Sequence, residues 1–127
     1  MHRIALLVCL AAIGCAASSP PQPVDTDPVR QSARAYVEAL RSQQWARACG
    51  LMTQAAREVL REEAGGSCRR ALAEGTALAP GELDAIRRQL AGARVQVRGE
   101  HATLGPLGDT GRSLALERRG GRWLVAG

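Results

Sequence analysis

Phenylalanine and lysine are absent from this chain of 127 residues, and its only aromatic residues are Tyr36, Trp45 and Trp123. A hydrophobic core must therefore be built from leucine, valine, isoleucine and alanine, which excludes a core dominated by aromatic packing. All 17 basic residues are arginine, and the formal net charge is +5. Because alanine and glycine are also abundant, we attribute the arginine skew to a GC-rich coding sequence rather than to a function.

The apolar run at the start of the chain is too short to span a bilayer. Residues 4–13 would rise about 15 Å as a helix, half the thickness of the hydrocarbon layer. Arg3 precedes this run and small residues follow it, a pattern typical of a secretory signal. The run ends at residues 12–15, AIGC, which resemble the lipobox of bacterial lipoproteins. The resemblance implies cleavage before Cys15 and a diacylglycerol thioether on its sulfur; ordinary secretion and an uncleaved anchor stay open.

The remaining sequence divides into a short tether and one domain. We assign residues 1–14 to a lipoprotein signal peptide, residues 15–26 to the lipidated cysteine and a disordered, proline-rich tether, and residues 27–127 to a single domain. These assignments predict an extracytoplasmic protein that is held on the bacterial cell membrane through a lipid on Cys15. Nucleic acid is not a natural partner there, and the sequence predicts no oligomeric state.

Cys49 and Cys68 are left as an even pair of cysteines in an oxidising compartment. Their spacing is not that of a CxxC redox motif, so we expect a structural disulfide, with two reactive free thiols as the alternative. His101 is the only histidine that remains after cleavage, which gives too few ligands for a zinc site. We therefore expect no metal and no cofactor.

The spacing of apolar residues predicts five helices in the first part of the domain. Asp27 is expected to cap the first helix, with Pro28 at its first helical position. Trp45 opens a short second helix, Thr53 caps a third and Ser67 a fourth. The positions expected to face inward are Val29, Ala33, Tyr36, Val37 and Leu40 in the first helix, Ala56, Val59 and Leu60 in the third, and Leu83, Ile86 and Leu90 in the fifth.

After residue 92 the apolar period changes from that of a helix to the alternation of strands. Two strands are expected on either side of a turn at residues 99–100, then a loop over residues 105–111, then two more strands joined at residues 120–121. Helices followed by an antiparallel meander predict an α+β fold with about four strands and the helices on one face. The expected inward positions are Ala93, Val95, Val97, Ala102, Leu104, Leu114, Leu116, Trp123 and Val125.

Four segments together resemble the nuclear transport factor 2-like, or cystatin-like, superfamily, and in particular small lipoproteins of high-GC Gram-positive bacteria. The segments are AYVEALRSQQWARACGLMT, CRRAL, VQVRGEHATL and LALERRGGRWLVAG, in that order over about a hundred residues. The resemblance implies a cone formed by helices and a curved sheet. It also implies kinship with ketosteroid-isomerase-like and polyketide-cyclase-like enzymes, which place acidic residues, or a tyrosine with a carboxylic acid, inside that cone.

The chain departs from those enzymes in its acidic residues. Asp25, Asp27, Asp84 and Asp109 fall in the tether, at a helix start, on a helix flank and in a loop, and none occupies an inward strand position. His101 lies on the polar side of its strand and is expected to be exposed. If the cone holds a pocket, the residues expected to line it are Tyr36, Trp45 and Trp123, although core packing is the ordinary role of aromatic residues on apolar stripes.

Two functions stay open on these grounds. A noncatalytic module that binds a protein partner or a small apolar ligand is favoured, because no titratable group is expected beside Tyr36 and no catalytic residue is assigned. The alternative is a pocket enzyme of the isomerase or cyclase kind. A Glu, Asp or His that lines a sizeable cavity with Tyr36 would overturn the noncatalytic interpretation, and the isomerase-like enzyme would replace it. A cluster of arginines expected near one hairpin is suited to phospholipid headgroups, to an acidic partner or simply to solvent: Arg112, Arg118, Arg119 and Arg122.

The lipid assignment gives a first prediction. Mass spectrometry of the membrane-extracted protein should show a diacylglyceryl group on an N-terminal Cys15, because the AIGC segment supplies the thiol that accepts it. The variant Cys15→Ser should accumulate as an unprocessed precursor. A Cys15→Ser protein that matures and fractionates like the wild type contradicts the assignment.

Overall fold

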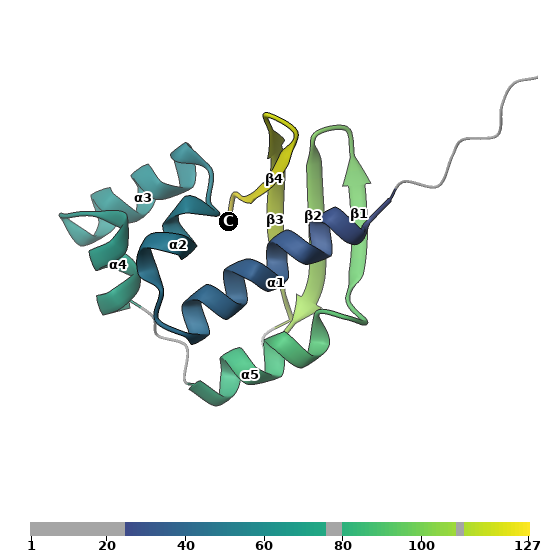
Figure 1. Cartoon of the computed structure of the whole chain (residues 1–127), viewed down its shortest axis with the longest axis horizontal. Coiled ribbons are helices and arrows are strands. Elements are labelled where there is room, and N and C mark those ends of the chain that lie inside the picture. Colours follow the sequence, from purple (N-terminus) through teal and green to yellow (C-terminus); the bar gives the residue numbers. More distant parts are fainter. Residues whose placement is uncertain (1–24, 76–79, 109–110) are drawn as a thin grey trace, which may run out of the picture.

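The computed structural model describes residues 25–75, 80–108 and 111–127 of the chain. In these residues five helices precede a four-stranded antiparallel sheet, so the expected α+β fold is confirmed (Figure 1). The predicted signal peptide, Cys15 and most of the predicted tether lie outside the described residues, as does Asp109. The elements are α1 (Asp27–Arg41), α2 (Trp45–Gly50), α3 (Gln54–Ala64), α4 (Cys68–Gly75), α5 (Pro80–Gln89), β1 (Arg94–Arg98), β2 (His101–Leu107), β3 (Arg112–Arg119) and β4 (Arg122–Val125).

The sheet is a simple meander in the order β1-β2-β3-β4, and one of its faces carries the expected apolar residues. Opposite one another on this face lie Val95 and Leu104, Leu104 and Leu114, and Leu116 and Val125. Because side chains alternate between the two faces of a strand, this register directs one apolar set to the helices. Of the nine expected inward residues, Ala93, Ala102, Leu104, Leu116 and Val125 are buried, and Val95, Val97, Leu114 and Trp123 are half-buried against the core.

Helix α1 crosses the apolar face of the sheet, with α5 beside it and α2, α3 and α4 beyond β4 (Figure 1). Its buried stripe contains Val29, Ala33, Val37 and Leu40, as the apolar spacing predicts. The link between α2 and α3 covers part of the outer edge of β4, because Val125 exchanges backbone hydrogen bonds of 2.8 Å with the segment around Met52. This link joins the α2–α4 group to the sheet.

The ends of the helices agree in part with the expected caps. Thr53 caps α3, where its hydroxyl accepts a 3.1 Å hydrogen bond from the amide of Ala56, and Ser67 does the same for Arg70 at 3.2 Å. Asp27 does not cap α1. It is already helical, and its amide donates to the carboxylate of Asp25 at 3.0 Å, so the helix begins earlier than expected.

One residue of α3 was expected to face inward and does not. Val59 is 53% exposed. The side of α3 that turns inward is marked by Ala56, Leu60 and Ala64, which repeat every four residues. At 100° per residue, Val59 lies about 100° around the helix from the middle of that side. The short apolar pattern did not distinguish these two directions.

The expected loop over residues 105–111 is shorter in the structure, because β2 continues to Leu107. A proline inside a central strand is unusual, since it lacks the amide that one neighbour needs. Pairing between β1 and β2 ends at Arg94 and Gly105, however, so Pro106 faces no partner on that side. The register between β2 and β3 also shifts between Leu104 and Leu107, which allows the strand to bend there.

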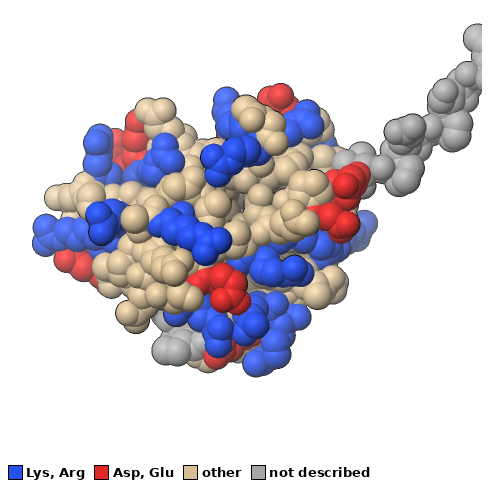
Figure 2. Space-filling view, in the orientation of Figure 1, with Lys and Arg blue, Asp and Glu red and all other residues tan. Residues whose placement is uncertain are grey.

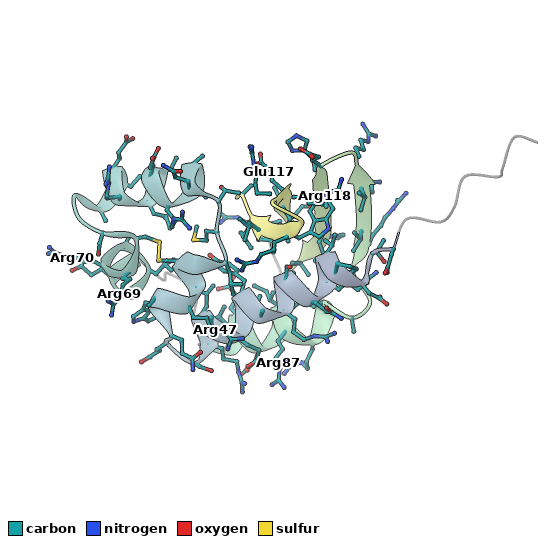
Figure 3. The ribbon with its side chains drawn as sticks, turned by 45° about the horizontal axis from the view of Figure 1, so that its top comes forward. Arg47, Arg69, Arg70, Arg87, Glu117 and Arg118 are labelled. Carbon is teal, nitrogen blue, oxygen red and sulfur yellow. A yellow bond between two sulfur atoms is a disulfide. The ribbon has the colours of Figure 1, made fainter. Side chains whose placement is uncertain are left out.

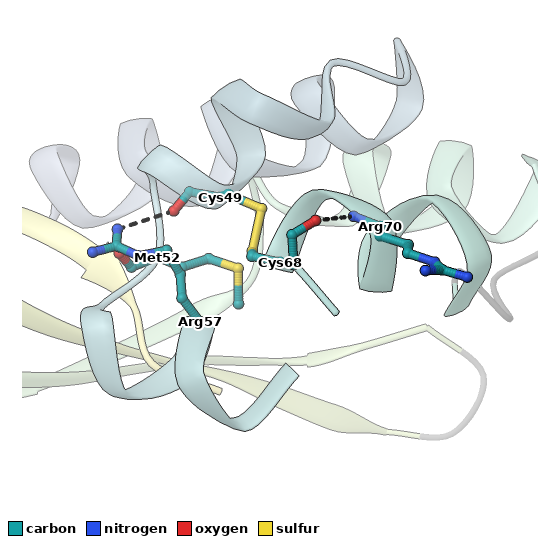
Figure 4. The surroundings of a disulfide bond; sticks show 6 residues. Cys49, Met52, Arg57, Cys68 and Arg70 are labelled. Atoms are coloured by element: carbon teal, nitrogen blue, oxygen red, sulfur yellow. Dashed lines mark hydrogen bonds between the residues drawn. A yellow bond between two sulfur atoms is a disulfide. The ribbon is translucent and has the colours of Figure 1, made fainter. Parts of the chain in front are cut away.

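Cys49 of α2 and Cys68 of α4 lie at disulfide distance, as expected, with their Cα atoms 6.1 Å apart (Figure 4). The guanidinium of Arg57 lies beside them and donates to the carbonyl oxygens of Cys49 at 3.2 Å and Met52 at 3.0 Å. It thereby adds a side-chain donor for carbonyl groups at and just after the end of α2, where the regular bonds of the helix stop. The disulfide and this arginine together hold α2, α3 and α4 as one group.

We predict that the disulfide stabilises the fold. Linking residues that are 19 apart in the sequence should contribute about 3 kcal/mol to the free energy of unfolding, by restricting the unfolded chain. Chemical denaturation should show this loss in a Cys49→Ala/Cys68→Ala variant, and the reduced wild type is the matched control. Peptide mapping without reductant should join the two cysteines; two free thiols in protein from its native envelope refute the prediction.

Candidate functional site

A hollow of about 380 Å³ lies between α1, α5 and the end of the sheet at which β2 meets β3. This volume falls within the range of pockets that bind small molecules. Most of its wall is aliphatic. The apolar residues that line it are Val37 and Leu40 of α1, Leu83 and Ile86 of α5, Leu107 of β2 and Leu114 of β3.

Polar contacts near the surface help to hold α5 beside the hollow, in addition to the packing of Leu83 and Ile86 against the core. Two ion pairs join α1 to α5, Arg41 with Asp84 and Arg87 with Glu38, the second at 2.7 Å. Arg30 of α1 also donates to the carbonyl oxygen of Leu90 at 2.9 Å, just after α5 ends. These contacts attach the outer side of α5 to α1. On the inner side of α5, aliphatic side chains leave unfilled the space that larger aromatic residues would occupy.

The polar part of the wall contains Tyr36, Glu82, Arg112 and Ser113. Burial raises the pKa of the Tyr36 hydroxyl, because desolvation disfavours the phenolate. Tyr36 is therefore a neutral hydrogen-bond donor at physiological pH. Among the described residues the Tyr36 hydroxyl has no hydrogen-bond partner. Every fully buried side-chain oxygen or nitrogen in these residues does have one. The Tyr36 hydroxyl is therefore not fully buried, and a ligand can reach it.

Glu82 lies in the first turn of α5 and is half-buried. It lines the same hollow as Tyr36, contrary to the expectation that no acidic residue would do so. That expectation rested on the four aspartates and on the inward strand positions, and a glutamate on a helix belongs to neither group. The available signal was spacing, because Glu82 precedes Ile86 by four residues and so shares its side of the helix.

The other expected site residues lie elsewhere. Trp45 packs against the core from α2, and Trp123 lines a separate shallow hollow beside the first turns of α1. His101 is exposed at the start of β2, with its ring 3.7 Å from the carboxylate of Glu117. Asp84 pairs with Arg41 on the surface, and neither Asp25 nor Asp27 lines the pocket.

Arg112 is separated from the other three arginines of the expected cluster. It begins β3, whereas Arg118 and Arg119 end that strand and Arg122 begins the next. Eight extended residues place the two ends of β3 roughly 23 Å apart. Arg112 therefore lies at the pocket, and the hairpin retains Arg118, Arg119 and Arg122.

Within residues 25–75, 80–108 and 111–127, no three His, Cys, Asp or Glu side chains gather as a metal site would require. The same residues contain no helix that is both long and apolar enough to cross a membrane. No family of known proteins matches the chain, and neither does any curated protein or any solved structure. The pocket is thus interpreted from its own residues.

The pKa of Tyr36 gives a direct prediction. Tyr36 is the only tyrosine, so the near-ultraviolet absorbance of tyrosinate reports this residue alone. Its titration midpoint should lie above the ordinary value of about 10. Because folding favours the neutral form, the associated stability is present below pH ~10 and is lost as the pH rises through the raised pKa. Thermal melts of Tyr36→Phe should not show this loss of stability at high pH. A tyrosinate titration with its midpoint at or below pH ~10 contradicts a buried Tyr36.

Proposed function

We propose that the protein is a membrane-anchored, extracytoplasmic lipoprotein with a nuclear transport factor 2-like domain, and that this domain binds a small, mostly apolar ligand without converting it. The observation that carries the proposal is the aliphatic hollow between α1, α5 and β3, with Tyr36 as an accessible donor in its wall. Pockets of this size with few polar groups are typical of ligand sites. The lipobox-like AIGC segment supports the location.

The composition of the wall sets the class of ligand. Its aliphatic residues favour a hydrocarbon body, since each buried methylene contributes about 0.8 kcal/mol. Tyr36 supplies one hydrogen-bond donor, which suits a carbonyl, ether or hydroxyl oxygen. Ser113 and the exposed Arg112 lie at the side of the hollow formed by β3. A molecule with an apolar body and one oxygen acceptor satisfies this arrangement.

The test is binding of N-phenyl-1-naphthylamine, a neutral apolar dye that fluoresces when it leaves water. The wild type should bind one dye per chain. Ile86→Trp, which fills the hollow from α5, should weaken binding at least ten-fold. Val59→Trp places the same side chain on the exposed side of α3 and should leave binding unchanged. No binding by the wild type, or an equal loss in both variants, contradicts a ligand pocket; thermal melts confirm that each variant folds.

A pocket enzyme of the isomerase kind is the second candidate, and the placement of Glu82 with Tyr36 favours it. In such a reaction the Glu82 carboxylate would take a proton from the carbon beside a ketone and return it further along the conjugated system. Tyr36 would donate a hydrogen bond to the enolate oxygen meanwhile. Glu82 thereby meets the condition set from the sequence for the isomerase. We still rank this candidate second, because no hydrogen bond joins the two side chains and a glutamate in the first turn of α5 is also explained by the positive end of the helix dipole.

An absorbance assay separates the two functions. An apolar β,γ-unsaturated ketone becomes conjugated on isomerisation and gains near-ultraviolet absorbance. The noncatalytic proposal expects no turnover by the wild type. If the wild type turns the ketone over, and the rate falls a hundred-fold or more in Glu82→Gln while the dye still binds, the isomerase replaces the noncatalytic proposal. Glu58→Gln on exposed α3 is the control for loss of one carboxylate.

A further inference from the structure

The two hairpin turns of the meander lie at the same end of the sheet, at residues 99–100 and 120–121 (Figure 1). Arginines gather at this end. Figure 2 shows blue side chains over the top of the molecule, where the β3–β4 turn lies, with red between them. We define the hairpin cluster as Arg118, Arg119 and Arg122, all exposed.

The charges of the hairpin cluster are poorly compensated. Arg119 and Arg122 lie directly opposite one another on β3 and β4, and like charges in that position destabilise a hairpin. Arg119 contacts Glu117 at 3.1 Å, but that carboxylate also lies 3.7 Å from His101. Within the described part of the chain, Arg122 has no acidic partner. The cluster therefore presents positive charge that an external anion can neutralise.

Trp123 gives this end an apolar component. It is half-buried beside the first turns of α1, and the guanidinium of Arg118 lies over its ring, 5.9 Å from the centroid. Figure 3 shows Arg118 and Glu117 beside β4, whereas Arg47 and Arg69 point outward from α2 and α4 on the other side of the molecule. A tryptophan among arginines is the combination that favours the interface between water and lipid headgroups.

The hairpin cluster also lies close to where α1 begins. Pro28 and Gln31 of α1 share a shallow hollow with Gly121, Arg122 and Trp123. Residues 16–26, which would separate α1 from a lipid on Cys15, span at most about 40 Å when fully extended. If Cys15 is lipidated as proposed, the end of the sheet near the start of α1 is therefore held within reach of the membrane.

From these observations we propose that the hairpin cluster docks on an anionic phospholipid surface and sets the orientation of the anchored domain. Arg119 and Arg122 contact headgroup phosphates from one face of the hairpin, and Arg118 with the exposed part of Trp123 meets the surface from the other face. Near an anionic surface each arginine strengthens association about five-fold at ordinary salt. The docking rests on the proposed lipid anchor but not on the pocket, which opens at the opposite end of β3.

The experiment uses the mature lipidated protein in vesicles of phosphatidylcholine, with or without a third of phosphatidylglycerol. Hydrogen exchange of the peptide over residues 118–123 should be several-fold slower on the anionic vesicles than on the neutral ones. The difference should vanish in concentrated salt. Arg119→Gln/Arg122→Gln should abolish it, whereas Arg47→Gln/Arg69→Gln removes the same charge from exposed positions away from the hairpin and should preserve it.

Three results overturn the docking. The first is hydrogen exchange of residues 118–123 at the same rate on both kinds of vesicle. The second is loss of the difference between the vesicles in both double variants alike. The third is slower exchange only in native membranes that contain proteins, which would assign the hairpin to a protein partner. Flotation on neutral vesicles separates this failure from that of the anchor. A protein that does not float lacks the lipid on Cys15, and one that floats without a composition-dependent change has the anchor but no docking surface.

Discussion

The packing of α1 on one face of the sheet is the constraint on which the rest of the structure depends. Val29, Ala33, Val37 and Leu40 form its buried stripe, and Leu104, Leu116 and Val125 meet it from the strands. Without phenylalanine, this layer is thin and made of small aliphatic groups that must fit closely. Both neighbouring groups of helices are positioned relative to α1, with α5 on one side and α2–α4 on the other.

The two groups of helices are attached to this layer by different physical means. A disulfide, the backbone bonds of Val125 and the carbonyl contacts of Arg57 secure α2, α3 and α4. Helix α5 is held by the packing of Leu83 and Ile86 against the core, together with ion pairs and hydrogen bonds near the surface that contribute about 0–1 kcal/mol each in water. No covalent link or strand pairing joins α5 to its neighbours among the described residues.

Much of the fold was predictable because its strongest signals are local. The alternation of Val95, Val97 and Leu104 fixes the inward face, and Thr53 and Ser67 mark helix starts through their own hydroxyl groups. Other features depend on tertiary context. Pro106 remains in β2 only because β1 has already ended, and the side of α3 on which Val59 lies is decided by its neighbours.

The pocket was predictable only through Tyr36. Its helical spacing places it on the side of α1 that faces α5 and the sheet, but the partners in the wall come from distant segments. The four-residue spacing from Ile86 places Glu82 on the same side of α5, but the positions of α5 and of the start of β3 depend on tertiary packing, and no local pattern places Arg112 at the hollow. A candidate residue such as Tyr36 is therefore easier to identify from the sequence than the set of residues that forms the site.

A crystal structure of the protein grown with N-phenyl-1-naphthylamine tests the ligand pocket most directly. We expect density for the dye between α1 and α5, in contact with Ile86 and Leu114 and beside the Tyr36 hydroxyl. We also expect the ion pairs of Arg41 and Arg87 to join the two helices still. An α5 that packs directly onto β3, with its own side chains filling the hollow and no dye bound there, would show that the pocket does not bind ligands.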